Sequence, residues 1–144
     1  MVNSIVYLSK ANREFTEQEL QALCADFATK NKLLNITGFL YFKNGMFLQY
    51  IESSDDAVQT LLKTLKKDDR HTIYFECSFN TFSTICFPSW QMNWLTLNLG
   101  FNQSNQQLLL NTIQFIVNMD LSEGNHLETI KNLVLRVRDT IYCL

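Results

Sequence analysis

The dipeptide Asn44-Gly45 is the feature that most limits how this chain can fold. It separates two runs rich in apolar and aromatic residues, Thr37–Lys43 and Met46–Glu52. Both residues of an Asn-Gly pair readily adopt positive φ, which a type I′ turn requires at its two central positions. Because such a turn joins antiparallel strands, the sequence predicts a β-hairpin in the first half of the chain.

The segments on either side of this hairpin alternate between strand and helix. A capping box at Thr16 and Glu19 indicates one helix start, and the capping segment Ser54-Asp55-Asp56 indicates another. Strands are predicted, by their apolar β-forming runs, over Ser4–Ser9, Ile73–Asn80 and Trp90–Leu97. The order β-α-β-β-α-β-β predicts an α+β fold of the ferredoxin-like type, with two helices on one face of the sheet.

The chain changes character after Gly100, where Asn- and Gln-rich segments follow. Apolar residues recur there at three- and four-residue spacing, from Leu109 to Met119 and from Leu127 to Ile141, which predicts a C-terminal helical pair. We therefore divide the chain into a sheet-forming domain over 1–98 and a helical appendage over 99–144. We expect the appendage to cover the other face of the sheet or to contact a partner.

Composition excludes several classes of function. With 12 Lys and Arg against 14 Asp and Glu, the net charge of −2 gives no basic footprint for nucleic acid or anionic lipid. No apolar run approaches the ~18 residues of a membrane-spanning helix, and no signal peptide is expected. The four cysteines show no CxxC spacing, so we expect reduced thiols and a cytoplasmic protein.

Motifs for common cofactor and metal chemistry are also missing from the sequence. There is no GxGxxG or GxxxxGK phosphate loop and no GxSxG nucleophile motif. Two histidines, His71 and His126, are too few for a His-rich metal site. We expect neither a bound metal nor hydrolytic activity.

Three polar side chains fall where the apolar pattern calls for hydrophobic ones. Tyr7 and Gln49 share strand faces with apolar neighbours, and Asn31 ends the apolar face of the first helix. A buried amide or phenol without a partner costs about 1–3 kcal/mol, so each one alone is best explained by hydrogen bonds within the core. Three of them on the helix-covered side of one sheet favour a polar ligand between helices and sheet.

These features together resemble a BLUF domain, the flavin-binding blue-light sensor of bacteria. The resembling stretch extends from about Ser4 to Leu97, and it is similar to the sensors of photoactivated adenylate cyclases and to short stand-alone members. Its motifs are Ile5-Val6-Tyr7-Leu8-Ser9, Asn31, Ile36-Thr37-Gly38, Asn44-Gly45-Met46-Phe47-Leu48-Gln49, Asp68-Asp69-Arg70-His71 and Phe87-Pro88-Ser89-Trp90-Gln91-Met92. The sequence departs from the family at Ile51-Glu52-Ser53, where many members have Leu-Glu-Gly, and at Ile85-Cys86-Phe87, where an arginine commonly precedes the phenylalanine.

The resemblance implies a photochemical pair. Tyr7 matches the tyrosine that gives an electron and a proton to the excited flavin, and Gln49 matches the glutamine whose amide rearranges in the light state. Trp90 and Met92 match the strand that responds to this switch and relays the signal.

The resemblance also implies FAD as the cofactor, while FMN and riboflavin, which carry the same ring, stay open as alternatives. Asn31 matches the amide bonded to the pyrimidine edge of the ring. The remaining cofactor-binding residues implied are the aliphatic pair Leu23 and Leu65 beside the ring, and Lys30, Arg70 and His71 near the ribityl and phosphate groups.

The function implied is that of a photosensor in 1–98 that signals by protein–protein contact through 99–144, without enzymatic activity. The expected partners are a flavin, an unidentified downstream protein and further copies of this chain. The alternative is a ferredoxin-like regulatory module that binds a small ligand without photochemistry. A flavin enzyme is a third hypothesis, and no substrate-pocket motif supports it.

Overall fold

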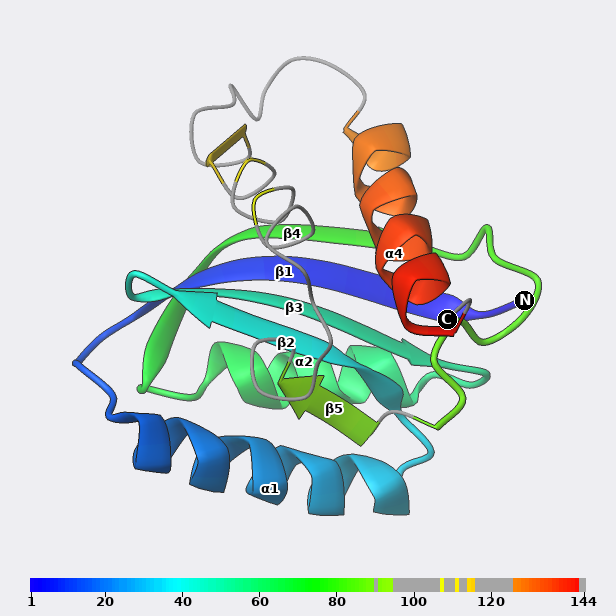
Figure 1. Ribbon diagram of the computed structural model, residues 1–144. Coiled ribbons are helices and arrows are strands. Elements are labelled where there is room, and N and C mark those ends of the chain that lie inside the picture. Colours follow the sequence, from blue (N-terminus) through cyan, green and yellow to red (C-terminus); the bar gives the residue numbers. More distant parts are fainter. Residues whose placement is uncertain (90, 95–106, 108–110, 112–113, 116–125, 143–144) are drawn as a thin grey trace.

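The computed structural model describes residues 1–89, 91–94, 107, 111, 114–115 and 126–142 (Figure 1). Its elements are β1 (Asn3–Ala11), α1 (Glu17–Leu33), β2 (Thr37–Lys43), β3 (Met46–Ser53), α2 (Ala57–Lys66), β4 (His71–Phe79), β5 (Gln91–Trp94) and α4 (Leu127–Tyr142). None of these helices is long and apolar enough to cross a membrane. Most of the first helix of the predicted C-terminal pair and the end of the last predicted strand lie outside the described residues.

The five strands form one sheet in the order β4-β1-β3-β2-β5. The pairs β1–β3, β1–β4 and β2–β3 are antiparallel, and β5 joins the edge of β2 in parallel. Helices α1 and α2 lie on one face of the sheet, and α4 lies on the other (Figure 1). The predicted α+β, ferredoxin-like arrangement with two helices on one face is confirmed.

The predicted hairpin and helix starts are present with small differences. Asn44 and Gly45 have φ values of 54° and 77°, as a type I′ turn requires. The Thr16 side chain accepts a hydrogen bond from the Glu19 amide at 3.1 Å and caps α1. At α2 the cap bond comes from Asp55 of the predicted capping segment, whose Oδ1 accepts from the Ala57 amide at 2.9 Å.

The sheet separates two hydrophobic cores. Alternation along each strand sends successive side chains to opposite faces, so both faces of β1 and β3 are apolar and both are buried. The core under α1 and α2 is formed by Ile5, Tyr7, Leu20, Leu23, Ile36, Leu40, Phe47, Ile51, Val58, Leu62 and Leu65. The core under α4 is formed by Val6, Leu8, Phe39, Tyr41, Leu48, Tyr50, Phe79, Cys86, Phe87, Ile130, Leu133, Val134 and Val137.

Gly38 is the point where three strands meet. It pairs with Ile51 of β3 on one side and with Gln91 of β5 on the other. Its φ is +150°, and a Cβ at this position would fall within van der Waals overlap of the Tyr50 carbonyl. Only glycine allows β2 and β3 to approach this closely.

We predict that Gly38→Ala destabilises the protein by at least about 2 kcal/mol, because the added methyl meets backbone and not a flexible side chain. Gly45→Ala is the matched control, since its φ of +77° is also unfavourable but its Cβ would meet no atom. We expect about 1–2 kcal/mol for that change. Urea unfolding of both variants tests the difference, and equal losses would contradict the steric explanation.

Candidate functional site

Tyr7 and Gln49 face each other across the two central strands. They are direct partners in the antiparallel β1–β3 ladder, and both side chains point to the face covered by α1 and α2. Directly opposed residues in such a ladder have Cβ atoms about 4.5–5.5 Å apart. The ladder therefore holds a phenol beside an amide, and both residues are buried, at 2% and 1% exposure.

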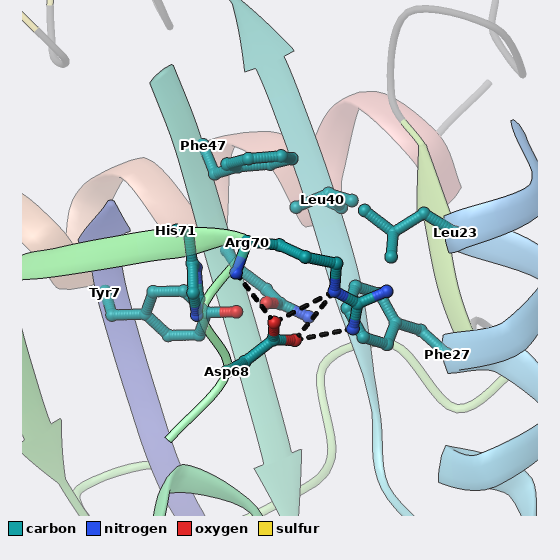
Figure 2. Close-up of a pocket in the computed structure, with 9 residues that line it drawn as sticks. Tyr7, Leu23, Phe27, Leu40, Phe47, Asp68, Arg70 and His71 are labelled. Carbon is teal, nitrogen blue, oxygen red and sulfur yellow. Dashed lines mark hydrogen bonds and ion pairs between the residues drawn. The ribbon is translucent and has the colours of Figure 1, made fainter. Parts of the chain in front are cut away.

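This pair lines a small, partly open pocket between the sheet and α1, with a cavity volume of about 20 Å³. Figure 2 shows the Tyr7 ring entering from β1, while Leu23 and Phe27 project from α1 on the opposite side. Four of the nine lining residues are apolar and five carry polar groups, a mixture that can both bury a small molecule and fix its orientation. The lining residues are Tyr7, Leu23, Phe27, Leu40, Phe47, Gln49, Asp68, Arg70 and His71.

A β-bulge in β4 turns His71 into this pocket. The β1–β4 register shifts between Leu8 and Ser9, so that Tyr74 has no partner and Ile73 pairs with Ser9. The extra residue reverses the face that residues 71–73 would occupy in a regular strand, and His71 therefore lies on the same face as Tyr7. The two rings meet edge to face with centroids 6.0 Å apart.

Both ring nitrogens of His71 have protein partners. Nε2 lies 2.9 Å from the Leu65 carbonyl and Nδ1 lies 2.9 Å from the Ser9 hydroxyl. A carbonyl only accepts, so Nε2 carries the proton, and in the neutral ring Nδ1 accepts from Ser9. These two bonds fix the ring as a wall of the pocket.

Asp68 and Arg70 form an ion pair at the pocket. Arg70 Nε donates to both carboxylate oxygens of Asp68, at 2.9 and 3.1 Å, and its guanidinium also lies 5.8 Å from the centre of the Phe27 ring (Figure 2). Hydrogen bonds from Arg70 hold the pKa of the Asp68 carboxyl below its usual value. The pocket thus carries one fixed positive and one fixed negative group.

Tyr7 is held as a neutral phenol. Burial raises its pKa above the usual value, the Asp68 carboxylate raises it further, and Arg70 opposes the shift. The phenol therefore keeps its proton at neutral pH until a neighbouring group accepts it.

The other predicted cofactor residues lie around the pocket and not in its lining. Asn31 is 2% exposed on the same face of α1 as Leu23 and Phe27, and its Nδ2 is buried without a hydrogen-bond partner. Leu65 is buried in the core under α2. Lys30 is largely exposed and is paired with Asp26 at 3.0 Å.

Sequence reasoning did not assign four of the lining residues: Phe27, Leu40, Phe47 and Asp68. Phe27 and Phe47 follow from the helical and strand periodicities that place Leu23 and Gln49 on this side. Trp90 and the side chain of Met92 lie outside the described residues. Within the described part of the chain, no three His, Cys, Asp or Glu side chains are grouped to hold a metal ion.

One family model matches this chain, that of BLUF, described as sensors of blue-light using FAD, over residues 2–93. The chain belongs to the BLUF family. The resemblance inferred from the sequence motifs is thereby confirmed, and so is its place among blue-light flavin photoreceptors.

Related proteins include photoactivated adenylate cyclases. The chain is 34% identical over 71 residues to photoactivated adenylate cyclase subunit beta of Euglena longa and to that of Euglena gracilis. The match covers 49% of this chain and 8% of each relative, so the chain spans only a small part of their length.

Solved BLUF structures share the fold. BlsA in its photo-activated state gives a TM-score of 0.74 at 24% identity, over 96% of this chain and 95% of that chain. BlrB, a BLUF protein in its dark state, gives 0.70 at 18% identity, over 96% of each chain. A bacterial light-regulated adenylyl cyclase gives 0.65 at 30% identity, over 79% of this chain and 34% of that chain.

We predict that Asp68→Asn costs up to about 1 kcal/mol of stability at pH 7, because the ion pair with Arg70 is partly exposed. Asp68 has a lowered pKa in the folded protein, so its contribution is present above the unfolded value of about 3.9 and is lost as pH falls through the folded pKa. Urea unfolding of both proteins between pH 7 and pH 3 measures this. A difference that grows toward acid pH would contradict the assignment.

Proposed function

We propose that this protein is a blue-light photoreceptor in which Tyr7 and Gln49 are the photochemical pair beside a bound flavin. The observation that carries the proposal is their direct cross-strand pairing on the helix-covered face, inside one pocket. Membership of the BLUF family supports flavin as the ligand. The specific flavin we propose is FAD, with FMN and riboflavin as the alternatives.

The residues around the pocket suit a flavin. Leu23, Phe27 and Leu40 provide apolar walls for a planar ring. The unpartnered amide nitrogen of Asn31 provides a donor for a carbonyl at the polar edge of that ring. Arg70 provides positive charge for a phosphate group, and we place Lys30 and His71 in the same outer part of the site.

A bound flavin supplies absorption of blue light and, once excited, an acceptor for one electron and one proton. Burial raises the pKa of Tyr7 and keeps it a neutral phenol. Such a phenol gives up an electron readily only if its proton leaves at the same time, because loss of the electron alone would leave a positive charge in a buried site. Gln49 lies opposite Tyr7 in the ladder, and its amide oxygen can accept a hydrogen bond from the Tyr7 hydroxyl. Close pairing in the ladder keeps the two groups aligned without further motion.

Gln49 is suited to act as a switch because an amide has one donor end and one acceptor end. Rotating or tautomerising the amide changes which end faces the cofactor, and no net charge moves. Such an element has two arrangements that light can set and heat can reset. We propose that Trp90 and Met92 relay this change.

No net chemical reaction results, so we propose a sensor and not an enzyme. The division we propose is a photosensor over 1–98 and an output segment over 99–144. The partners we propose are a downstream protein and further copies of this chain, with no membrane or nucleic acid involved. We place the protein in the cytoplasm of a bacterial cell.

The decisive test uses Tyr7→Phe and Gln49→Leu in the flavin-loaded protein. The first keeps the ring but removes the phenolic proton, and the second keeps approximate size but removes both ends of the amide. We expect both variants to stay folded and yellow and to lose the reversible, light-induced red shift of the flavin absorption band. Difference spectra before and after blue light, followed through dark recovery, measure this.

A matched control is Phe47→Leu, which changes a neighbouring apolar wall of the same pocket without removing a polar group. We expect it to retain the red shift. A Gln49→Leu protein that keeps the full red shift would refute the switch. A wild-type protein that stays colourless after reconstitution with flavin would favour the non-photochemical, ligand-binding module instead.

We also predict that Asn31→Ala weakens flavin binding about tenfold, or about 1.4 kcal/mol, through loss of one hydrogen bond to the ring. The apoprotein should lose little stability, since Nδ2 has no partner to lose. Thermal melts of the apo and flavin-loaded forms separate the two effects. Equal destabilisation of both forms would mean that Asn31 supports only the fold.

A further inference from the structure

Glu52 is a fully buried carboxylate on the face of the sheet opposite the pocket. Its exposure is 0%, and it lies on β3 three residues after Gln49. Its Oε1 accepts from the Tyr50 hydroxyl and the Cys86 amide, each at 2.9 Å. Its Oε2 accepts from the Phe87 amide at 2.7 Å and from the Thr37 hydroxyl at 3.1 Å.

All four donors to Glu52 are neutral, and no Lys or Arg pairs with it among the described residues. The segment Ile85-Cys86-Phe87, which supplies two of these donors, contains no basic side chain, although an arginine commonly precedes the phenylalanine in the family. The nearby Arg138 of α4 bonds to Asp139 and interacts with Cys86. Two backbone amides therefore hold the carboxylate, and the carboxylate holds those amides in return.

These two amides belong to the segment that leads into β5. Phe87 is followed four residues later by Gln91, the first residue of β5. β5 does not pair with β3 directly, because β2 lies between them, and Gly38 pairs with Ile51 on one side and Gln91 on the other. Glu52 thus connects β3 directly to the segment that precedes β5, in addition to the strand pairing through β2.

Tyr50 connects this carboxylate to the strand position beside Gln49. Its hydroxyl donates to Glu52 and therefore accepts from the Ser4 hydroxyl on β1, at 3.0 Å. No water replaces these donors at a fully buried carboxylate, so a shift of β3 acts directly on the bonds between Glu52 and the Cys86 and Phe87 amides.

We propose that Glu52 is a positioning residue that couples a shift of β3 at Gln49 to the segment entering β5. This inference rests on the proposed photochemical function. In the light state the contact between Glu52 and the Cys86 and Phe87 amides loosens, and β5 changes its pairing with β2 at the same time.

The first test uses the wild-type, flavin-loaded full chain and measures amide hydrogen exchange in the dark and under blue light. We expect the amides of residues 86 and 87 to exchange at least threefold faster in the light, together with those of 91–94. Both changes should reverse with the time course of the flavin absorbance. A red shift with unchanged exchange at 86 and 87 overturns the coupling alone, whereas a protein without a red shift overturns the photochemical function as well.

The second test compares Glu52→Gln with the control Thr37→Val. A glutamine has one acceptor oxygen, so its NH₂ group must face one of the two amide N–H groups, while Thr37→Val keeps both amide bonds. For Glu52→Gln we expect an intact red shift and a light-minus-dark exchange difference at 91–94 reduced at least fivefold. Thr37→Val should keep at least half of that difference.

Because Glu52→Gln is expected to keep the red shift, the second test separates the coupling from the photochemistry of the flavin. A Glu52→Gln protein with the full exchange difference at 91–94 overturns the proposal. So does a Thr37→Val protein that loses the difference as completely as Glu52→Gln. If Glu52→Gln does not fold, the wild-type exchange at residues 86 and 87 decides the question on its own.

Discussion

The antiparallel register of β1 with β3 is the constraint on which the rest of the molecule depends. It places Tyr7 opposite Gln49 and leaves Ile5 and Ile51 opposite one another on the same face. A slip of one residue would send Tyr7 or Gln49 to the face covered by α4 and separate the pair. The register is held because each slipped arrangement would also exchange the side chains of two filled cores.

The bulge in β4 adds a second constraint, since it places His71 beside Tyr7. The imidazole then bonds to Ser9 of β1 and to the Leu65 carbonyl at the end of α2. The His71 ring therefore connects the edge strand β4 to the central strand β1 and to helix α2 at the pocket wall. The Asp68–Arg70 pair precedes it in the chain and is positioned by the same turn from α2 into β4.

Much of this arrangement could be predicted from the sequence because it depends on local rules. The Asn44-Gly45 turn, the capping residue Thr16 and the apolar faces of both helices have strong local patterns. Tyr7 and Gln49 could be assigned to inward-facing positions by alternation, and the family resemblance implies the roles proposed for them. Their direct opposition could not be predicted by alternation alone, which gives a face but not a register.

Other features depend on contacts far apart in the sequence. The β4 strand shows no glycine or other mark of its bulge, so the pairing of Ser9 with Ile73 could not be anticipated. The four bonds to Glu52 come from residues between 2 and 35 positions away. Asp68 belongs to the motif Asp68-Asp69-Arg70-His71, but its bidentate pairing with Arg70 requires the backbone turn that brings them together.

The two cores lie on opposite sides of one sheet and share no side chain. Substitutions in one core therefore meet those in the other only through strand backbones, and distant independent changes are usually additive in their effect on stability. A substitution in the layer beneath α4 therefore leaves the side chains of the layer beneath α1 and α2 in place. The sheet acts as a partition across which the two sides of the protein can be changed separately.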